Sequence, residues 1–157
     1  MWRRLNVHLH GPEGIRVRVR EVDNTLYVWV AGSEHPAHWW HHFLPGARRR
    51  EIRAGIELAD AIRCAMPIVI GGHSVGGCIA EIAASMLRAP CYTYGGKRAP
   101  RRYRINATRY RRRGDIVPFL PPWRPANRHI LIGKWAPFWR SHLPKEYYAT
   151  AREVGLR

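Results

Sequence analysis

A serine between two glycines is the feature of this sequence that is best suited to chemistry. Gly72-His73-Ser74-Val75-Gly76 is preceded by a short apolar run at residues 67–70 and followed by an apolar-periodic stretch at residues 78–87. A serine in a sharp turn from strand to helix projects its hydroxyl above the sheet, where the helix N-terminus favours an oxyanion. The motif therefore predicts Ser74 as a nucleophile, with an N-capping serine in a glycine-rich turn as the alternative. We expect His73 to pack beneath this turn.

A nucleophilic serine needs a base and an acid, and in this arrangement the acid and then the histidine follow it along the chain. Asp115 is the one aspartate in the sequence after Ser74, and two histidines, His129 and His142, follow Asp115. His142 lies in a predicted loop, whereas His129 begins a predicted strand. The residues therefore favour Asp115 as acid and His142 as base, leaving His129 as the alternative base. A solvated partner for nearby arginines is the alternative interpretation of Asp115.

The elements that must position these residues follow from hydrophobic periodicity. Strands are predicted at residues 5–9, 15–20, 26–30, 67–70, 91–94, 104–110 and 129–132. Helices are predicted at residues 48–64, with Ile52, Ile56, Ala59 and Ile62 facing inward, at residues 78–87, with Ile79, Ile82, Ala83 and Met86 facing inward, and at residues 145–153. Alternating strands and helices predict an α/β fold with a mostly parallel central sheet flanked by helices.

Several motifs resemble those of the class 3 (fungal-type) lipases of the α/β-hydrolase superfamily. The family's nucleophile motif G-H-S-L-G-G is similar to residues 72–77, and its strand ending in F-R-G-[ST] resembles residues 28–33. Its T-[FY]-G-x-P-R segment resembles residues 93–98. Its acid motif D-x-V-P-x-L-P-P resembles residues 115–122, and its final D-H-x-x-Y-[FY] resembles residues 141–148, with extra residues between the histidine and the tyrosines.

The resemblance implies one compact α/β-hydrolase domain over residues 1–157 that cleaves an ester or lipid without a cofactor. It implies Ser74 as nucleophile, Asp115 as acid and His142 as base, and an oxyanion hole formed by the backbone N–H groups of Ser33 and Val75. His129 matches a family histidine that is not the base. The segment from Glu34 to Gly46 is short where the family carries a lid helix, so we expect a minimal lid. His38 and Ser141 stand where the family has aspartates.

Composition limits the classes of protein to which the chain can belong. The 157 residues carry 27 Lys and Arg against 11 Asp and Glu, a formal charge of +16, and 46% are hydrophobic. This composition can fill a core, which argues against a disordered basic tail. No apolar run approaches the ~20 residues that cross a bilayer, and the first residues lack the apolar stretch of a secretion signal. We therefore expect a cytoplasmic protein. The three cysteines, Cys64, Cys78 and Cys91, are expected to pack as small apolar side chains.

The basic residues are compatible with several kinds of binding partner. Residues 97–128 contain eleven cations and one acid, Asp115. This run fits a solvated basic face, or a surface that attracts anionic lipid or an acidic ester. It also fits nucleic-acid binding, with bases stacked on Tyr103, Tyr110 and Trp123. A second function therefore stands beside the enzyme: a basic nucleic-acid or anionic-surface binding module on a hydrolase scaffold that has lost catalysis.

Two other aromatic or histidine-rich features have open interpretations. His35, His38, His41 and His42 form a cluster in which His38 and His42, four residues apart, could supply two ligands to a metal. No carboxylate or thiolate accompanies them at zinc-like spacing, so no metal is expected. Trp39, Trp40 and Phe43 would instead line the acyl side of the cleft or attach this segment to the body. Self-association through Trp123, Trp135 and Trp139 is also open.

Overall fold

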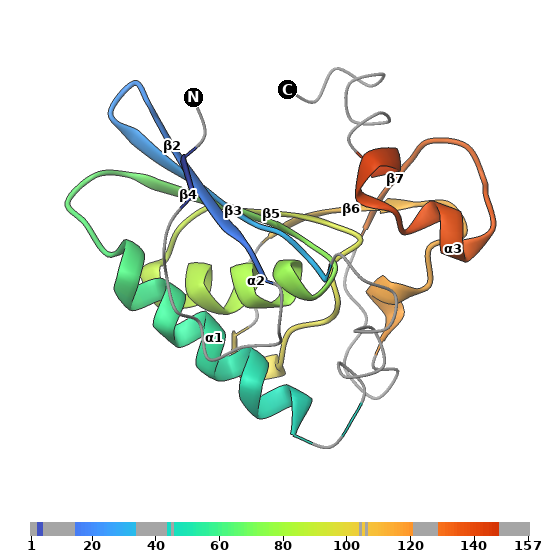
Figure 1. Cartoon of the computed structure of the whole chain (residues 1–157), viewed down its shortest axis with the longest axis horizontal. Helices are drawn as coiled ribbons and strands as arrows, with labels where there is room; N and C mark the ends of the chain where they lie inside the picture. Colours follow the sequence, from blue (N-terminus) through green and yellow to red (C-terminus); the bar gives the residue numbers. More distant parts are fainter. Residues whose placement is uncertain are drawn as a thin grey trace.

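The computed structural model describes residues 3–4, 15–33, 44, 46–103, 105, 107–120 and 129–147. Seven strands in this part of the chain form one sheet in the order β1-β2-β3-β4-β5-β6-β7 (Figure 1). The first three strands pair antiparallel, and β3 to β7 are parallel. The strands are β1 (Arg3–Arg4), β2 (Val17–Val22), β3 (Thr25–Val30), β4 (Ile68–His73), β5 (Cys91–Tyr94), β6 (Thr108–Arg112) and β7 (Ile130–Ile132). The predicted α/β fold with a mostly parallel sheet is confirmed.

A tight hairpin joins β2 to β3 because the two residues between them adopt the left-handed region. Asp23 and Asn24 have φ values of 48° and 56°, the backbone of a two-residue turn that matches the twist of the strands. β3 then pairs with β4 on its other edge, and Val28 and Val30 are buried. This strand therefore lies inside the sheet, as its apolar run predicts. The predicted strand at residues 5–9 lies outside the described residues.

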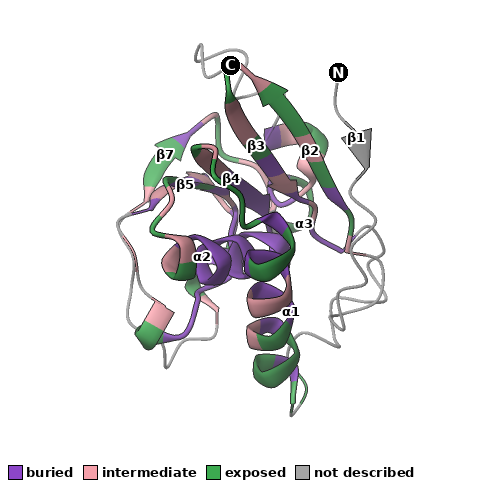
Figure 2. Ribbon diagram, turned by 90° about the vertical axis from the view of Figure 1, so that its left-hand side faces the viewer, coloured by how far each residue is buried: buried purple, intermediate pink, exposed green. Residues whose placement is uncertain are grey.

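Two helices, α1 (Ala47–Ile62) and α2 (Val75–Leu87), cover the same face of the sheet (Figure 1). Figure 2 shows α2 as the more deeply buried of the two, and every residue from Val75 to Ala84 is buried. The helix therefore starts three residues earlier than predicted, because β4 continues to His73 and the turn between them is the single residue Ser74. Met86 was predicted to face inward, but it is 36% exposed, because it lies in the last turn of the helix.

The inner face of α1 includes Ala59 and Ile62, as predicted, but it differs in its first half. Ile52 and Ile56 are half-buried, whereas Glu51, expected on the outer face, is fully buried with Ala54, Leu58 and their neighbours. The Glu51 carboxylate accepts a hydrogen bond from the Lys97 ammonium, which is itself buried. The Cys78 thiol also lies 3.7 Å from Glu51 Oε2. An opposite charge supplied from a distant segment allows a glutamate to occupy the core side of the helix.

We expect Glu51→Gln to lower the free energy of unfolding by about 3–5 kcal/mol, because it leaves the Lys97 charge buried without its carboxylate. Urea unfolding of the purified variant measures the loss. The double variant Glu51→Leu with Lys97→Met, which removes both charges, should recover most of it. Glu57→Gln is the matched control on the same helix, since it removes the charge from an ion pair with the exposed Arg53 and should cost below about 1 kcal/mol. Equal losses for the two glutamine variants would contradict the buried pair.

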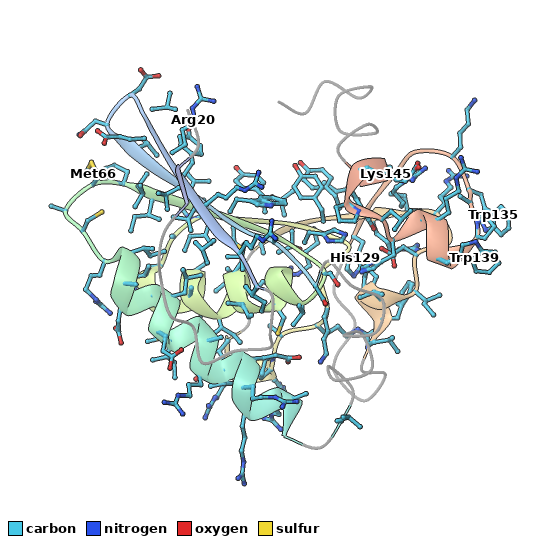
Figure 3. All side chains as sticks on the ribbon, in the orientation of Figure 1. Arg20, Met66, His129, Trp135, Trp139 and Lys145 are labelled. Atoms are coloured by element: carbon cyan, nitrogen blue, oxygen red, sulfur yellow. The ribbon has the colours of Figure 1, made fainter. Side chains whose placement is uncertain are left out.

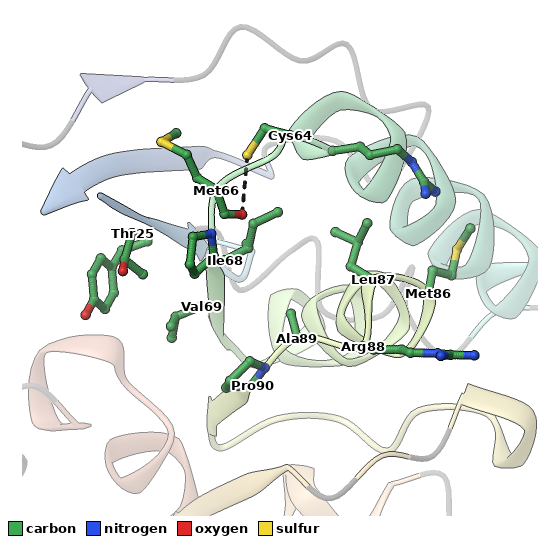
Figure 4. Close-up of a pocket in the computed structure, with 13 residues that line it drawn as sticks. Thr25, Cys64, Met66, Ile68, Val69, Met86, Leu87, Arg88, Ala89 and Pro90 are labelled. Atoms are coloured by element: carbon green, nitrogen blue, oxygen red, sulfur yellow. Dashed lines mark hydrogen bonds between the residues drawn. The ribbon is translucent and has the colours of Figure 1, made fainter. Parts of the chain in front are cut away.

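The three cysteines are free thiols, and Cys78 and Cys91 are buried as predicted. The prediction was wrong for Cys64, which is exposed because it follows the end of α1. Cys64 borders a recess of about 670 Å³ between the start of β4 and the end of α2, lined also by Met66, Ile68 and Leu87 (Figure 4). None of the described helices is long and apolar enough to span a bilayer.

Candidate active site

The turn between β4 and α2 holds Ser74 in a backbone conformation that L-residues rarely adopt. Its φ and ψ are 57° and −127°, a strained region that persists only where surrounding contacts enforce it. The Ser74 N–H donates to Tyr94 O at 3.2 Å, and Ser74 O accepts from the N–H groups of Gly77 at 3.1 Å and Lys97 at 3.0 Å. These contacts hold the serine at the carboxyl edge of the sheet and at the N-terminus of α2.

Glycine is required two residues before and two residues after Ser74. A Cβ atom at Gly72 would lie 2.4 Å from Gly76 O, and a Cβ atom at Gly76 would lie 2.4 Å from Val30 O. Both distances are far inside van der Waals contact, so the glycines allow β3, β4 and α2 to meet closely. The spacing that singled out Ser74 in the sequence therefore has a steric cause, and the N-cap alternative is not supported because Ser74 makes no side-chain capping bond.

Ser74, His142 and Asp115 form one chain of hydrogen bonds. His142 Nε2 lies 2.8 Å from Ser74 Oγ, and His142 Nδ1 lies 2.9 Å from Asp115 Oδ2. Since an ionised carboxylate can only accept, Nδ1 carries the proton and Nε2 accepts from the serine hydroxyl. The structure thus brings together the three side chains that the sequence selected, with the tautomer that a general base requires.

Asp115 is held as a buried carboxylate, which the solvated alternative does not allow. It is fully buried, and its Oδ1 accepts from the Val117 N–H at 3.0 Å. Its Oδ2 accepts from the Tyr147 hydroxyl as well as from His142. Val117 belongs to the 3₁₀ turn η4 (Val117–Phe119), which follows Asp115 directly. Each oxygen therefore has a donor, so the carboxylate orients the imidazole without free rotation.

Tyr147 is a site residue to which the sequence reasoning assigned no role. It is fully buried, donates to Asp115 and accepts from the Arg112 N–H at 3.1 Å. Burial, followed by the Asp115 charge, raises the pKa of Tyr147 far above its usual value, so the hydroxyl remains a neutral donor. The only signal for it in the sequence was the tyrosine pair at the end of the last motif. It belongs to a helical turn at residues 144–147, the described part of the helix predicted at 145–153.

The segment that carries His142 is fastened to the loop that carries Asp115. Helix α3 (Phe138–Ser141) ends one residue before His142. Ser141 Oγ lies 2.7 Å from Ala136 O and 3.0 Å from Arg113 O. Ser141 stands where the related motif has aspartate, yet its hydroxyl connects α3 to the residues before Asp115. The segments that carry Asp115 and His142 are therefore joined through this side chain.

His73 was predicted only to pack beneath the turn, but it also contacts the main chain of His142. Its Nε2 lies 3.0 Å from the His142 carbonyl oxygen, so this nitrogen carries the proton and donates. The two rings lie 4.9 Å apart. Burial, followed by the neighbouring His142, lowers the pKa of His73 well below its usual value. His73 is therefore a neutral imidazole that fixes the main chain of the base.

The residues expected to form the oxyanion hole lie at the ends of two adjacent strands. Ser33, 8% exposed, follows β3, and Val75 is the first residue of α2, where helical N–H groups have no partner within the helix. A Cβ atom at Gly32 would lie only 2.7 Å from Ser74 Cβ, so the loop carrying Ser33 passes beside the serine. The short segment expected to form a minimal lid lies almost wholly outside the described residues.

His129 does not reach Ser74, because it stands beside the edge strand β7. Its ring packs near Phe119, with centroids 6.1 Å apart. Burial, followed by the charges of Arg109, Arg111 and Arg98, lowers the pKa of His129 to about 4. His142, and not His129, is the histidine that the fold places in contact with the serine.

We expect His129→Gln to make stability less dependent on pH between 6.5 and about 4. In this window the unfolded chain protonates His129 and the folded chain does not, so the free energy of unfolding falls as the pH falls. The slope reflects how many more protons the unfolded chain binds than the folded chain, and removing His129 should lower that number by up to one. His73 keeps its own contribution to the slope. Urea titrations at several pH values measure the slope. An unchanged slope would show that His129 titrates alike in both states.

Much of the basic run between residues 97 and 128 is used inside the protein. Arg109 binds the Glu81 carboxylate through two hydrogen bonds of 2.7 and 3.1 Å, and Arg112 binds Glu146 at 2.9 Å. Both arginines are buried, as are Lys97 and Arg98. A wholly solvated basic face was therefore the wrong interpretation of this run, because three distant acids draw its cations inward.

The described part of the chain contains no group of three metal-ligating side chains. The histidine cluster at residues 35–42 lies outside it, as do Trp39, Trp40, Phe43 and Trp123. The recess of Figure 4 lies at the amino end of β4, whereas Ser74 follows the carboxyl end of that strand. In open parallel sheets ligands bind at the carboxyl ends, so the recess is separate from this site.

The sheet, the serine turn and its flanking helices define a lipase-like α/β-hydrolase fold. Among solved structures, the chain is similar to one described as fungal lipases, with a TM-score of 0.57 and 18% identity, covering 83% of this chain and 63% of the other. It is also similar to a mutant form of MDLA from Penicillium cyclopium, with a TM-score of 0.53 and 19% identity at the same coverages. The chain thus spans 63% of the length of each. No protein-family model and no curated protein matches the sequence.

Proposed function

We propose that this protein is a serine carboxylic-ester hydrolase that acts through an acyl-enzyme. The observation that carries the proposal is the hydrogen-bonded chain from Ser74 Oγ through His142 to the buried Asp115 carboxylate. The lipase-like fold supports it, because in that fold a serine at a strained strand-to-helix turn is the nucleophile.

Each residue has a defined role in the proposed reaction. His142 Nε2 takes the Ser74 proton as Oγ attacks the ester carbonyl, and Asp115 stabilises the imidazolium that forms. The backbone N–H groups of Ser33 and Val75 stabilise the oxyanion. His142 then donates its proton to the leaving alcohol, the acyl group stays on Ser74, and water activated by His142 releases the acid. No cofactor takes part in these steps.

The experiment that tests this function is hydrolysis of p-nitrophenyl esters from short to long acyl chains, together with labelling by a fluorophosphonate that reacts with activated serines. We expect turnover and a single covalent adduct on Ser74, identified by peptide mass. The acyl-length optimum distinguishes an esterase from a lipase. A folded protein that neither hydrolyses any of the esters nor reacts with the probe would overturn the proposal. The alternative, a basic nucleic-acid or anionic-surface binding module without catalysis, would then explain the +16 charge.

A further inference from the structure

Two tryptophans, Trp135 and Trp139, project from the outer side of the segment that carries His142. Trp135 is 72% exposed and Trp139 is 65% exposed, the largest exposures among the exposed large hydrophobic residues of the described chain. Figure 3 shows both side chains at the end of the molecule that lies opposite Arg20. Indole rings that are exposed to this extent mark an interaction surface, because their burial against a partner would be favourable.

The residues directly before Trp135 and directly after Trp139 are cations. Lys134, Arg140 and Lys145 are exposed, and with Trp135 and Trp139 they form what we call the tryptophan face. The nearest acid in this segment, Glu146, is bound to Arg112 at 2.9 Å and reaches Arg140 only at 3.9 Å. The tryptophan face is therefore apolar and positively charged at once.

We propose that the tryptophan face docks the protein on an anionic lipid surface. Indole rings favour the boundary between headgroups and acyl chains, and each nearby cation adds attraction to anionic headgroups. A second copy of this chain fits less well, because pairing two such faces would bring six like charges together. Nucleic acid also fits less well, because single strands are bound in grooves with stacking platforms, whereas these tryptophans project outward.

The tryptophan face lies on the same segment of chain as His142 of the proposed active site. Trp139 lies in α3, three residues before His142, and Ser141 Oγ connects this helix to Ala136 O and Arg113 O beside Asp115. Docking through the indoles would therefore hold the base loop against the lipid surface. That consequence, delivery of a lipid ester to Ser74, rests on the proposed function, whereas the binding itself does not.

Vesicle flotation of the Ser74→Ala protein tests the docking without any hydrolysis. Phosphatidylcholine vesicles are compared with vesicles that also contain phosphatidylglycerol, and we expect binding to the second kind that weakens with added salt. Trp135→Ala with Trp139→Ala should weaken it at least about tenfold. Lys134→Gln with Lys145→Gln should weaken it by about fivefold for each charge removed. The matched control, Tyr27→Ala with Arg20→Gln, removes an exposed aromatic and a cation from the strands β2 and β3 and should leave binding unchanged.

Circular dichroism and thermal melts establish that each variant is folded. Equal binding to both kinds of vesicle, no binding to either, or equal losses in the control would overturn the proposal. Tryptophan-dependent binding of an oligonucleotide or a tryptophan-dependent dimer, without vesicle binding, would assign the face to nucleic acid or to a second copy. Failure of ester hydrolysis in the native protein would leave the vesicle result intact, so the two proposals fail separately.

Discussion

Replacing Ser74 by alanine is expected to lower kcat/KM for p-nitrophenyl esters by a factor of at least about 10⁴. The alanine keeps the Cβ atom in the strained turn but removes the oxygen that His142 Nε2 contacts at 2.8 Å. His142→Ala should cause a loss of similar size, and the double variant should lose little more, because the two side chains act as one unit. Initial rates measured below KM give the comparison directly.

Ser85→Ala is the matched control for Ser74→Ala, because Ser85 lies near the other end of α2 and away from the turn. Its activity should equal that of the native protein. All variants should retain the native circular dichroism spectrum. Residual activity of Ser74→Ala within tenfold of native would mean that another group attacks the ester and would refute the assigned nucleophile.

Asp115→Asn is expected to lower kcat by about 10³–10⁴ while leaving KM within a few-fold of native. The amide is the size of the carboxylate, but it carries no charge to stabilise the imidazolium and can present N–H instead of O to His142 Nδ1. In that orientation the amide nitrogen also faces the Tyr147 hydroxyl, which donates to the same carboxylate oxygen in the native protein, while the amide oxygen keeps the bond from the Val117 N–H. The imidazole is left in the wrong tautomer for accepting the serine proton.

Tyr147→Phe is the informative comparison for Asp115→Asn, because it removes one donor to the same carboxylate and leaves the charge in place. We expect a loss in kcat of about tenfold or less and a cost in stability of about 1–3 kcal/mol from the unpaired Arg112 N–H. Steady-state kinetics and urea unfolding separate the two effects. A Tyr147→Phe rate as low as that of Asp115→Asn would show that the tyrosine hydroxyl, rather than the carboxylate charge, enables His142 to accept the serine proton.

The sequence by itself predicted most of the elements in their order along the chain, and it singled out Ser74 as the candidate nucleophile. Strong periodicity and a short apolar run predict α1, β3, β4 and β5 because local patterns decide whether a segment is helix or strand. The spacing of Gly72 and Gly76 about Ser74 is equally local, since their missing Cβ atoms allow close contacts around one turn. Chain order then narrowed the acid to Asp115 and the base to His142 or His129.

The tertiary structure alone decided which distant groups meet. It buried Glu51 against Lys97, 46 residues away, on a helix whose charged residues were all expected on the outer face. It placed His142 rather than His129 beside Ser74, and it brought Tyr147 against Asp115 and His73 against the main chain of His142. These contacts join segments far apart in the chain, and a charge or hydroxyl can enter the core only where the fold supplies its partner. Local periodicity contains no information about that partner.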